Sequence, residues 1–360
     1  MLNFKSYLVE GYQSTVLKHL EHPHHLHIQH GKQGFTAAKK FLNNTHHALT
    51  GKSHNLHISR KVDGGVSVIV GHDDKGVHVS TKSAFAKTPK INRSHSDIER
   101  HHGHAPGLVK TLKHVYDNAH KFVNKGHTVQ GDLLYTKADA PKHKGGITHY
   151  TPNALPMHHE GKPKNVAIAL HTHYKNGKAH AGVPSHMVKS HPDVHLHHTD
   201  FKPTPSKYTS QHRSQFQHHM AKAEEHHSKL GNHPHMNDVH KERMQTYLNQ
   251  TVRDKSTPNV NDYKKHLHSL GQKAASKVKT DAAKQRHINN WKAHVDHVEK
   301  HKDHFANSFK VHDHLKHAKD ALIKGHMHPS DEGLVVAHGK GKVKLVPSNV
   351  SHALLTNTRF

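Results

Sequence analysis

The spacing of apolar residues changes twice along this chain, and these changes limit the folds open to it. From about 54 to 175, short apolar runs such as Val66–Val70 are separated by turn residues, which is typical of β-strands. From 176 to 325 the spacing becomes helical, and strand-like runs return at Gly333–Val336 and Val343–Val346. We therefore predict an α+β fold with antiparallel sheets and a large helical insertion.

Individual elements follow from the same patterns. Strands are predicted at 54–62, 66–70, 77–80, 128–135 and 166–172, with a turn at 73–76 and a helix near 107–124. One helix face near the N-terminus is marked by Phe35, Ala38, Leu42 and Leu49. A second apolar stripe predicts one long helix through Trp291, Val295, Val298, Phe305 and Phe309. Asn261 and Thr280 are the predicted N-caps in this region.

Four segments result, and we interpret the helical one as an insertion within a single sheet domain. They are a helical lead-in at 1–50, the first part of the core at 51–175, a basic, His-rich helical insertion at 176–325, and the last strands of the core at 326–360.

The charge of the chain indicates a polyanionic partner. There are 53 Lys and Arg residues against 27 Asp and Glu, which gives a formal charge of +26 with every His neutral. Such an excess favours nucleic acid. An acidic membrane surface ranks lower, because no long basic helix has a convincing Trp/Phe/Leu face. No apolar run approaches 18 residues, so no transmembrane helix is predicted, and the N-terminus lacks the apolar stretch of a secretion signal.

Histidine is unusually frequent, at 53 residues, whereas cysteine is absent. The lack of Cys excludes disulfides, Cys-zinc sites and thiol catalysis. Histidine is the commonest metal ligand, but at this content about eight His pairs at i, i+4 spacing arise by chance. We therefore expect mainly a solvated, compositionally biased surface, with a His-rich metal buffer as an alternative.

The segment Ser59–Ser67 contains a K-x-D-G string at Lys61–Gly64. Taken alone, Asp-Gly between two apolar strands favours a β-hairpin. A chemical interpretation gains support from three later features in order. Gln130–Tyr135 places a carboxylate at the end of a strand, Asp331–Val336 sets a carboxylate beside another strand, and Lys342 and Lys344 alternate on the next one.

In this order, the motifs resemble those of the ATP-dependent DNA/RNA ligase and capping-enzyme superfamily of covalent nucleotidyltransferases. Lys61–Gly64 resembles the nucleophile motif, and Gly131–Leu133 resembles a G-E-L-type motif with Asp in place of Glu. Glu332–Val336 resembles an E-G-x-V-type motif, and Lys342–Lys344 the final K-x-K. Thr81–Ser83 stands where the superfamily has a ribose-contacting motif, with Lys82 in place of the usual Arg.

This resemblance implies a ligase-type nucleotidyltransferase that uses ATP and Mg²⁺ or Mn²⁺. Lys61 would be the catalytic nucleophile that forms lysyl-AMP, and Glu332 and Asp132 would bind the metal. The nucleotide would be bound by Arg60, Asp63, Gly64, Lys82, Asp132, Lys342 and Lys344. The AMP would then pass to a 5′-phosphate of RNA or DNA.

The whole chain also resembles a narrower family of ligase-like tailed-phage proteins. The residues that prompt this are Thr81–Phe85, His102–Leu108 and Gln130–Thr136. Met1–Glu10 resembles a capsid-targeting peptide cut after a Leu-x-Glu sequence, so we expect the protein in the host cytoplasm or packaged in the virion.

One departure from the superfamily keeps a second interpretation open. Only 16 residues follow Lys344, which leaves no room for the usual C-terminal OB-type domain. The alternative is a catalytically inactive, basic, DNA-associated phage virion or packaging protein on the same scaffold.

Overall fold

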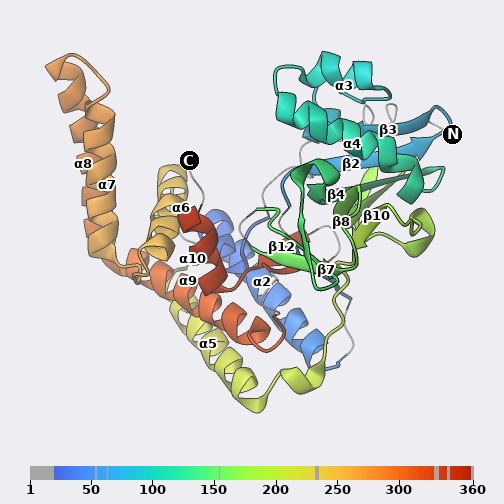
Figure 1. Ribbon diagram of the computed structural model, residues 1–360. Coiled ribbons are helices and arrows are strands. Elements are labelled where there is room, and N and C mark those ends of the chain that lie inside the picture. The colour runs from blue at the N-terminus through green and yellow to red at the C-terminus, as the bar shows by residue number, and fades with distance from the viewer. Residues whose placement is uncertain are drawn as a thin grey trace. The chain divides into compact units, whose positions relative to one another are not determined.

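The computed structural model describes most of the chain, and all statements below concern these residues (Figure 1). They are 20–52, 55–62, 64–153, 155–231, 235–327, 332–338 and 341–357. The chain divides into two compact units, the first built from 57–202 and 332–338, the second from 21–56, 203–327 and 341–357. Asp63, Asp331 and the predicted capsid-targeting peptide lie outside the described residues.

The first unit is built on a six-stranded sheet. Its strands are β2 (Ser67–Asp73), β3 (Gly76–Ser80), β4 (His127–Thr136), β8 (Val166–Lys175), β9 (Lys178–Ala181) and β10 (Val194–His197). The order is β10-β8-β4-β2-β3, with β9 also paired to β8. Every pairing is antiparallel except that of β10 with β8. The architecture is therefore α+β, as predicted.

Side chains that alternate along the strands fill two cores, one on each face of this sheet. On one face, Val68 and Ile168 pack with Val115 and Phe122 of the helical layer, which consists of α3 (His95–His102) and α4 (Pro106–Phe122) (Figure 1). On the other face, Ala167 joins a core with residues of a small sheet. That sheet consists of β5 (Lys142–Lys144), β6 (Ile147–Tyr150) and β7 (Met157–Glu160).

The K-x-D-G segment is not a hairpin turn, so the simplest structural interpretation of this segment was wrong. Strand β1 (His57–Lys61) pairs antiparallel with β11 (Gly333–His338), whereas β2 pairs with β3 and β4. The chain between β1 and β2 passes from one sheet to another. Gly65 N–H fixes this passage by donating to the carbonyl of Leu133 at 2.8 Å.

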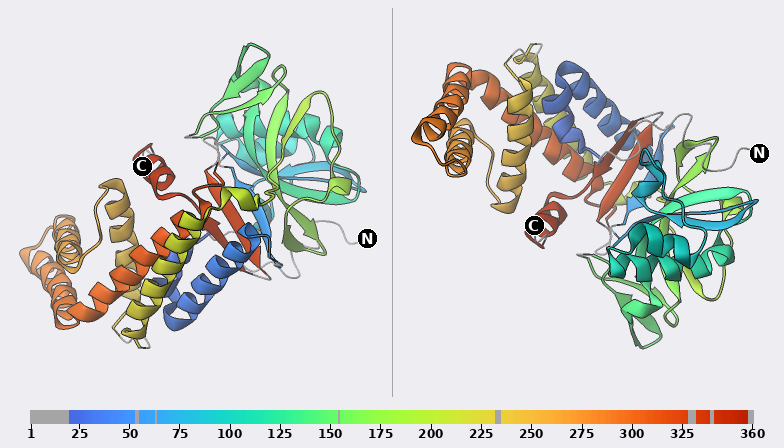
Figure 2. Two further views of the ribbon diagram at one scale, coloured as in Figure 1. Left: turned by 90° about the horizontal axis from the view of Figure 1, so that it is seen from below. Right: turned by 90° about the horizontal axis from the view of Figure 1, so that it is seen from above.

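The second unit is mainly helical (Figure 2). Its elements are α2 (Pro23–Leu49), α5 (Ser210–Ser228), α6 (Asp238–Arg253), α7 (Val260–Ala275), α8 (Asp281–Lys300), α9 (Lys302–Ile323), β12 (Gly341–Leu345) and α10 (Ser348–Asn357). Helix α9 packs against α5 and α2, and α7 packs against α8. The predicted apolar face of α2 is confirmed, since Phe35, Ala38, Leu42 and Leu49 are buried. Short 3₁₀ helices complete the two units: η1 (Lys82–Phe85), η2 (Lys137–Asp139), η3 (Ser185–Met187) and η4 (Pro205–Lys207).

Three details of the helical region differ from the sequence predictions. The apolar stripe from Trp291 to Phe309 spans two helices, because the backbone leaves helical geometry at His301 (φ −117°, ψ 32°). Asn259, not Asn261, caps α7 by accepting from Asp262 N–H, whereas Thr280 caps α8 as predicted. The residues before Ser210 that we assigned to the helical insertion include β9 and β10.

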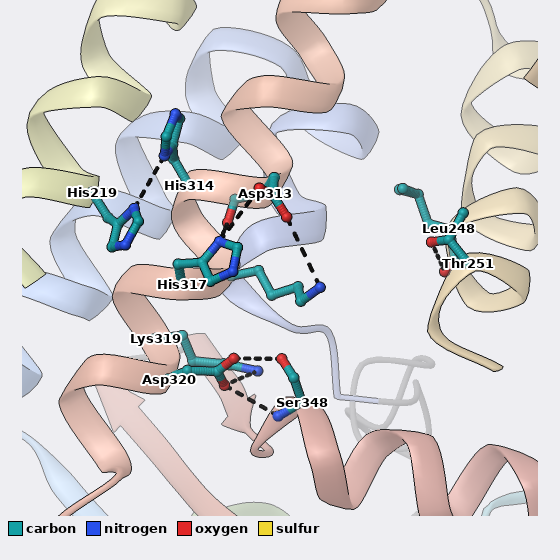
Figure 3. Close-up of polar contacts among 10 residues, drawn as sticks. His219, Leu248, Thr251, Asp313, His314, His317, Lys319, Asp320 and Ser348 are labelled. Carbon is teal, nitrogen blue, oxygen red and sulfur yellow. Dashed lines mark hydrogen bonds and ion pairs between the residues drawn. The ribbon is translucent and has the colours of Figure 1, made fainter. Parts of the chain in front are cut away.

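A buried lysine ties α9 to the chain segment that follows β12 (Figure 3). Lys319 donates to the carbonyl of Val346 and lies 3.0 Å from Asp320 Oδ1. The other carboxylate oxygen of Asp320 accepts from the Ser348 hydroxyl at 2.5 Å, where α10 begins. This network satisfies a fully buried ammonium group. None of the helices in the described ranges has both the length and the apolar character that a bilayer-spanning helix requires.

Eight histidines of the described residues are buried, so histidine also contributes to the interior, while most of the other described histidines reach solvent as expected. His78 and His240 are fully buried, and His24 and His312 nearly so. Burial of the imidazole disfavours the charged form. It lowers the pKa of His25 to about 3 and the pKa values of His78 and His240 to about 4.

These shifts predict a loss of stability on acidification. Below about pH 6.5 the unfolded chain binds protons at these histidines, while the folded chain stays neutral there until about pH 4. The free energy of unfolding should therefore fall continuously between pH 6.5 and 4, as measured by urea titration followed by circular dichroism. High salt separates this effect from general charge repulsion, which it screens. A free energy of unfolding that stays constant over this range at high salt would contradict the prediction.

Candidate functional site

Lys61 and Glu332 meet where two paired strands begin and end. Lys61 is the last residue of β1 and lies opposite Gly333 in β11, so Glu332 directly precedes its partner strand. Lys61 Nζ donates to Glu332 Oε1 at 2.5 Å. The Glu332 side chain is 5% exposed and that of Lys61 is 19% exposed. The ion pair is therefore largely shielded but open to solvent on the lysine side.

The residues after Lys61 hold it in place. Val62 packs against the core between the six-stranded sheet and the β5–β6–β7 sheet. Gly64 lies directly on β4, where a Cβ atom would meet the Leu133 carbonyl oxygen at 2.5 Å and Asp132 Cβ at 2.8 Å. The Gly of the K-x-D-G string is thus required for close backbone approach.

Asp132 belongs to the same neighbourhood. It lies opposite Ser67 on β2, and His171 Nε2 is 3.7 Å from its Oδ1. Burial alone would raise the pKa of Asp132, but hydrogen bonding and charge from His171, a hydrogen bond from Ser67 and the charge of Lys61 lower it below the usual value. Asp132 is therefore an ionised carboxylate whose charge responds to Lys61.

A β-bulge positions His171. In the β4–β8 ladder, Gln130 pairs with Thr172 and Gly131 with Leu170, so His171 is the extra residue on β8. Bulges redirect side chains and occur next to active sites. His171 was not among the predicted site residues. The polar pair His171 and Thr172 at the end of the apolar run Val166–Leu170 was a usable signal.

Further polar residues on this sheet were also missed. Gln130 Nε2 donates to Ser67 Oγ at 3.0 Å, and the Tyr174 hydroxyl donates to Gln130 Oε1 at 2.5 Å. Tyr174 also contacts Phe85 in η1. In the sequence these residues show only as polar positions that alternate with apolar ones along a strand. Ordinary solvated sheet faces have the same pattern, so it does not identify a site.

The other predicted site residues are placed as follows. Arg60 neighbours Lys61 in β1, so its side chain points to the opposite face, where the guanidinium lies 5.4 Å from the Phe201 ring centre. Lys82 begins η1 and is exposed. Lys342 and Lys344 belong to β12 in the second unit. Burial lowers the pKa of Lys342.

The chemistry of Glu332 and Asp132 fits a magnesium ion. Both offer carboxylate oxygens, the ligands that Mg²⁺ prefers. The ion commonly takes one or two protein carboxylates and completes its coordination with water and substrate phosphates. Glu332, which pairs with Lys61, and Asp132, on the strand that Gly64 contacts, are therefore the carboxylates that could hold such an ion.

Comparisons with known proteins place the chain in a family without assigning a function. A model described as a family of unknown function (DUF6267) matches residues 17–346, so the chain belongs to this family. No curated protein and no solved structure matches the chain.

Substitution of Gly64 and Gly65 one at a time should show whether the chain needs glycine because its backbone lies against β4, or tolerates any small side chain there. Gly64→Ala forces a Cβ against the backbone of β4 and should destabilise the protein by about 1–3 kcal/mol. Gly65→Ala is the matched control, because its nearest heavy atom would be the Pro152 carbonyl oxygen at 3.7 Å, an ordinary contact. Urea unfolding measures both. Equal stabilities of the two variants would contradict the placement of Gly64 on β4.

The ion pair predicts unequal effects of its two partners. Lys61→Ala removes the lysine cation from the buried Glu332 carboxylate, whereas Glu332→Gln leaves a lysine that can reach solvent. Loss of a partner in a buried pair costs about 3–5 kcal/mol, so Lys61→Ala should approach this range and Glu332→Gln should cost less. Chemical denaturation gives both values, with the double variant closing the cycle. If Glu332→Gln lowered the free energy of unfolding more than Lys61→Ala, Glu332 would not be the more deeply buried charge of the pair.

Proposed function

We propose that this protein is an ATP-dependent nucleotidyltransferase of the nucleic-acid ligase type, in which Lys61 takes up AMP. The supporting observation is the contact of Lys61 Nζ with Glu332 Oε1, with Asp132 on the part of β4 that Gly64 of the same K-x-D-G string contacts. A nucleophilic lysine needs a proton acceptor and an anionic surrounding that can hold a metal–nucleotide complex. Glu332 and Asp132 supply both.

The first step would form a phosphoramidate. The amine of Lys61 must be uncharged to attack the α-phosphorus of ATP, and Glu332 is placed to accept its proton. The nitrogen–phosphorus bond forms as the bond from the α-phosphorus to the bridging oxygen breaks. Pyrophosphate leaves with that oxygen, and AMP remains on Lys61. A divalent cation, held by Asp132 and by Glu332 before it takes the proton, would offset the charge of the phosphates.

The second step would return the lysine to its starting state. An oxygen of a nucleic-acid 5′-phosphate attacks the phosphorus of the lysyl adenylate, and the nitrogen–phosphorus bond breaks. Lys61 leaves as an amine and regains a proton, while the 5′ end carries AMP through a pyrophosphate linkage. The formal charge of +26 supports a nucleic acid as acceptor.

The first step is tested by label transfer from α-³²P-ATP with Mg²⁺ or Mn²⁺, followed by a denaturing gel. The wild type should give a labelled band, and Lys61→Ala should give none. Lys61→Arg should also give none, because the guanidinium stays protonated in proteins. Asp132→Asn should reduce the labelling rate by about 100-fold, as for loss of one electrostatic group at a reacting centre.

Lys75→Ala is the control for nonspecific loss of positive charge, because Lys75 is exposed in the turn between β2 and β3. It should label like the wild type. A folded wild-type protein that takes no label with either metal would overturn the proposal and favour the alternative of a nucleic-acid-associated protein without this chemistry. Label in Lys61→Ala would exclude Lys61 as the acceptor.

A further inference from the structure

Three histidines converge in the second unit. His297 lies in the last turn of α8, and His301 follows it by four residues, at the junction with α9. His235 comes from the segment before α6, whose N-cap is Asn237. Two histidines one helical turn apart form a common half of a metal site, and here a distant segment supplies a third.

Their nitrogen atoms are close enough for joint coordination. One ring nitrogen of each residue lies within 4.8 Å of the others. The rings of His235 and His301 stack at 3.6 Å, and those of His297 and His301 are 4.8 Å apart. Tetrahedral zinc with nitrogen ligands at about 2.0–2.1 Å requires nitrogen separations of roughly 3.3 Å. Imidazole coordinates through the in-plane lone pair of its nitrogen, so an ion shared by the three residues would require the His235 and His301 rings to turn out of their stacked contact.

Contacts behind the three rings restrict their orientation. His297 Nε2 donates to the carbonyl oxygen of His235 at 3.1 Å, which fixes the ring beside the segment before α6. The fully buried His240 stacks on His297 at 5.2 Å, and its Nδ1 lies 3.0 Å from the Tyr263 hydroxyl. Its Nε2 is buried without a hydrogen-bond partner among the described residues. Such support of ligand rings by surrounding groups is typical of metal sites.

The charges around this group favour it over the other cluster of three histidines in the described residues, His24, His25 and His312. The positive charge of the buried Lys319 acts on that cluster. The cation that acts on His301 is Lys300, which is exposed and screened by water. His235, His297 and His301 are each partly exposed, which gives an ion a path to them.

We propose that His235, His297 and His301 form a zinc site that joins the segment before α6 to the α8–α9 junction. Three neutral imidazoles with a fourth position for water are an established zinc environment. Binding would fix the segment at His235 against the helices and stabilise the second unit. The proposal is independent of the Lys61 chemistry, because it uses no residue of the first unit.

The test measures Zn²⁺ binding to the EDTA-treated full-length chain by titration calorimetry at pH 7.5. The wild type should show one tight site above the weak background expected from its many other histidines. His297→Gln and His301→Gln should each weaken that site by more than about 100-fold, since even supporting residues account for 10–100-fold. His25→Gln, in the other cluster, is the matched control and should retain it.

Two further readouts exclude misfolding as the cause. Co²⁺ in the tight site should give the visible absorption of tetrahedral coordination in the wild type and in His25→Gln only. Zn²⁺ should raise the melting temperature of the wild type and not that of His235→Gln, which changes a residue outside any helix. A tight site that survives both His297→Gln and His301→Gln, or one lost only in His25→Gln, would overturn the proposal.

Discussion

The antiparallel pairing of β1 with β11 is the constraint on which the candidate site depends. It joins Lys61 to Glu332, two residues separated by 271 positions in sequence. Such a contact closes a very long loop, and loop closure costs conformational entropy before any contact forms. The intervening chain reduces that cost by folding locally, since much of it forms helices that pack on their sequence neighbours, as α7 does on α8. Glu332 can then reach Lys61 through strand register alone.

The contact of Lys61 with Glu332 also bears on the proposed chemistry, because it concerns the protonation of the lysine. Lys61 Nζ and Glu332 Oε1 form an ion pair at 2.5 Å, yet the proposed nucleophilic attack needs the lysine as a free amine. The two demands are compatible if Glu332 is the group that removes the proton when a phosphate approaches. In the proposed reaction, a nucleotide with its divalent cation would change the balance of charge around both groups, and the ion pair would be the state before binding. Asp132 belongs to the same balance, because its pKa responds to Lys61.

The sequence predicted those features that depend on local periodicity. Strands β1 to β4, β8 and β11 and the buried face of α2 were predicted correctly, because apolar residues recur there at intervals that neighbouring residues determine. The hairpin interpretation of Lys61–Gly64 was wrong, because Asp-Gly between apolar strands specifies a turn but not the partner strand. His171 was missed for a related reason. A bulge is a property of two paired strands, and its register cannot be read from either strand alone.

Histidine content was the hardest feature to interpret from sequence, and the structure gives it a physical role. Only 32% of the residues are hydrophobic, so the cores of the two units must be filled with few apolar side chains. A neutral imidazole has a flat, partly apolar ring that packs against aromatic residues, as His240 does against Phe305 and Tyr263. The ring then remains neutral only because protonation is disfavoured by burial. The same neutral nitrogen atoms are those that bind a metal ion, so a chain that packs with histidine acquires acid sensitivity and metal affinity from one choice of residue. In our proposal, the neighbouring charges decide whether a histidine cluster binds a metal ion. The positive charge of Lys319 acts on the cluster at His24 and disfavours an ion there, and this distinguishes it from the cluster at His297.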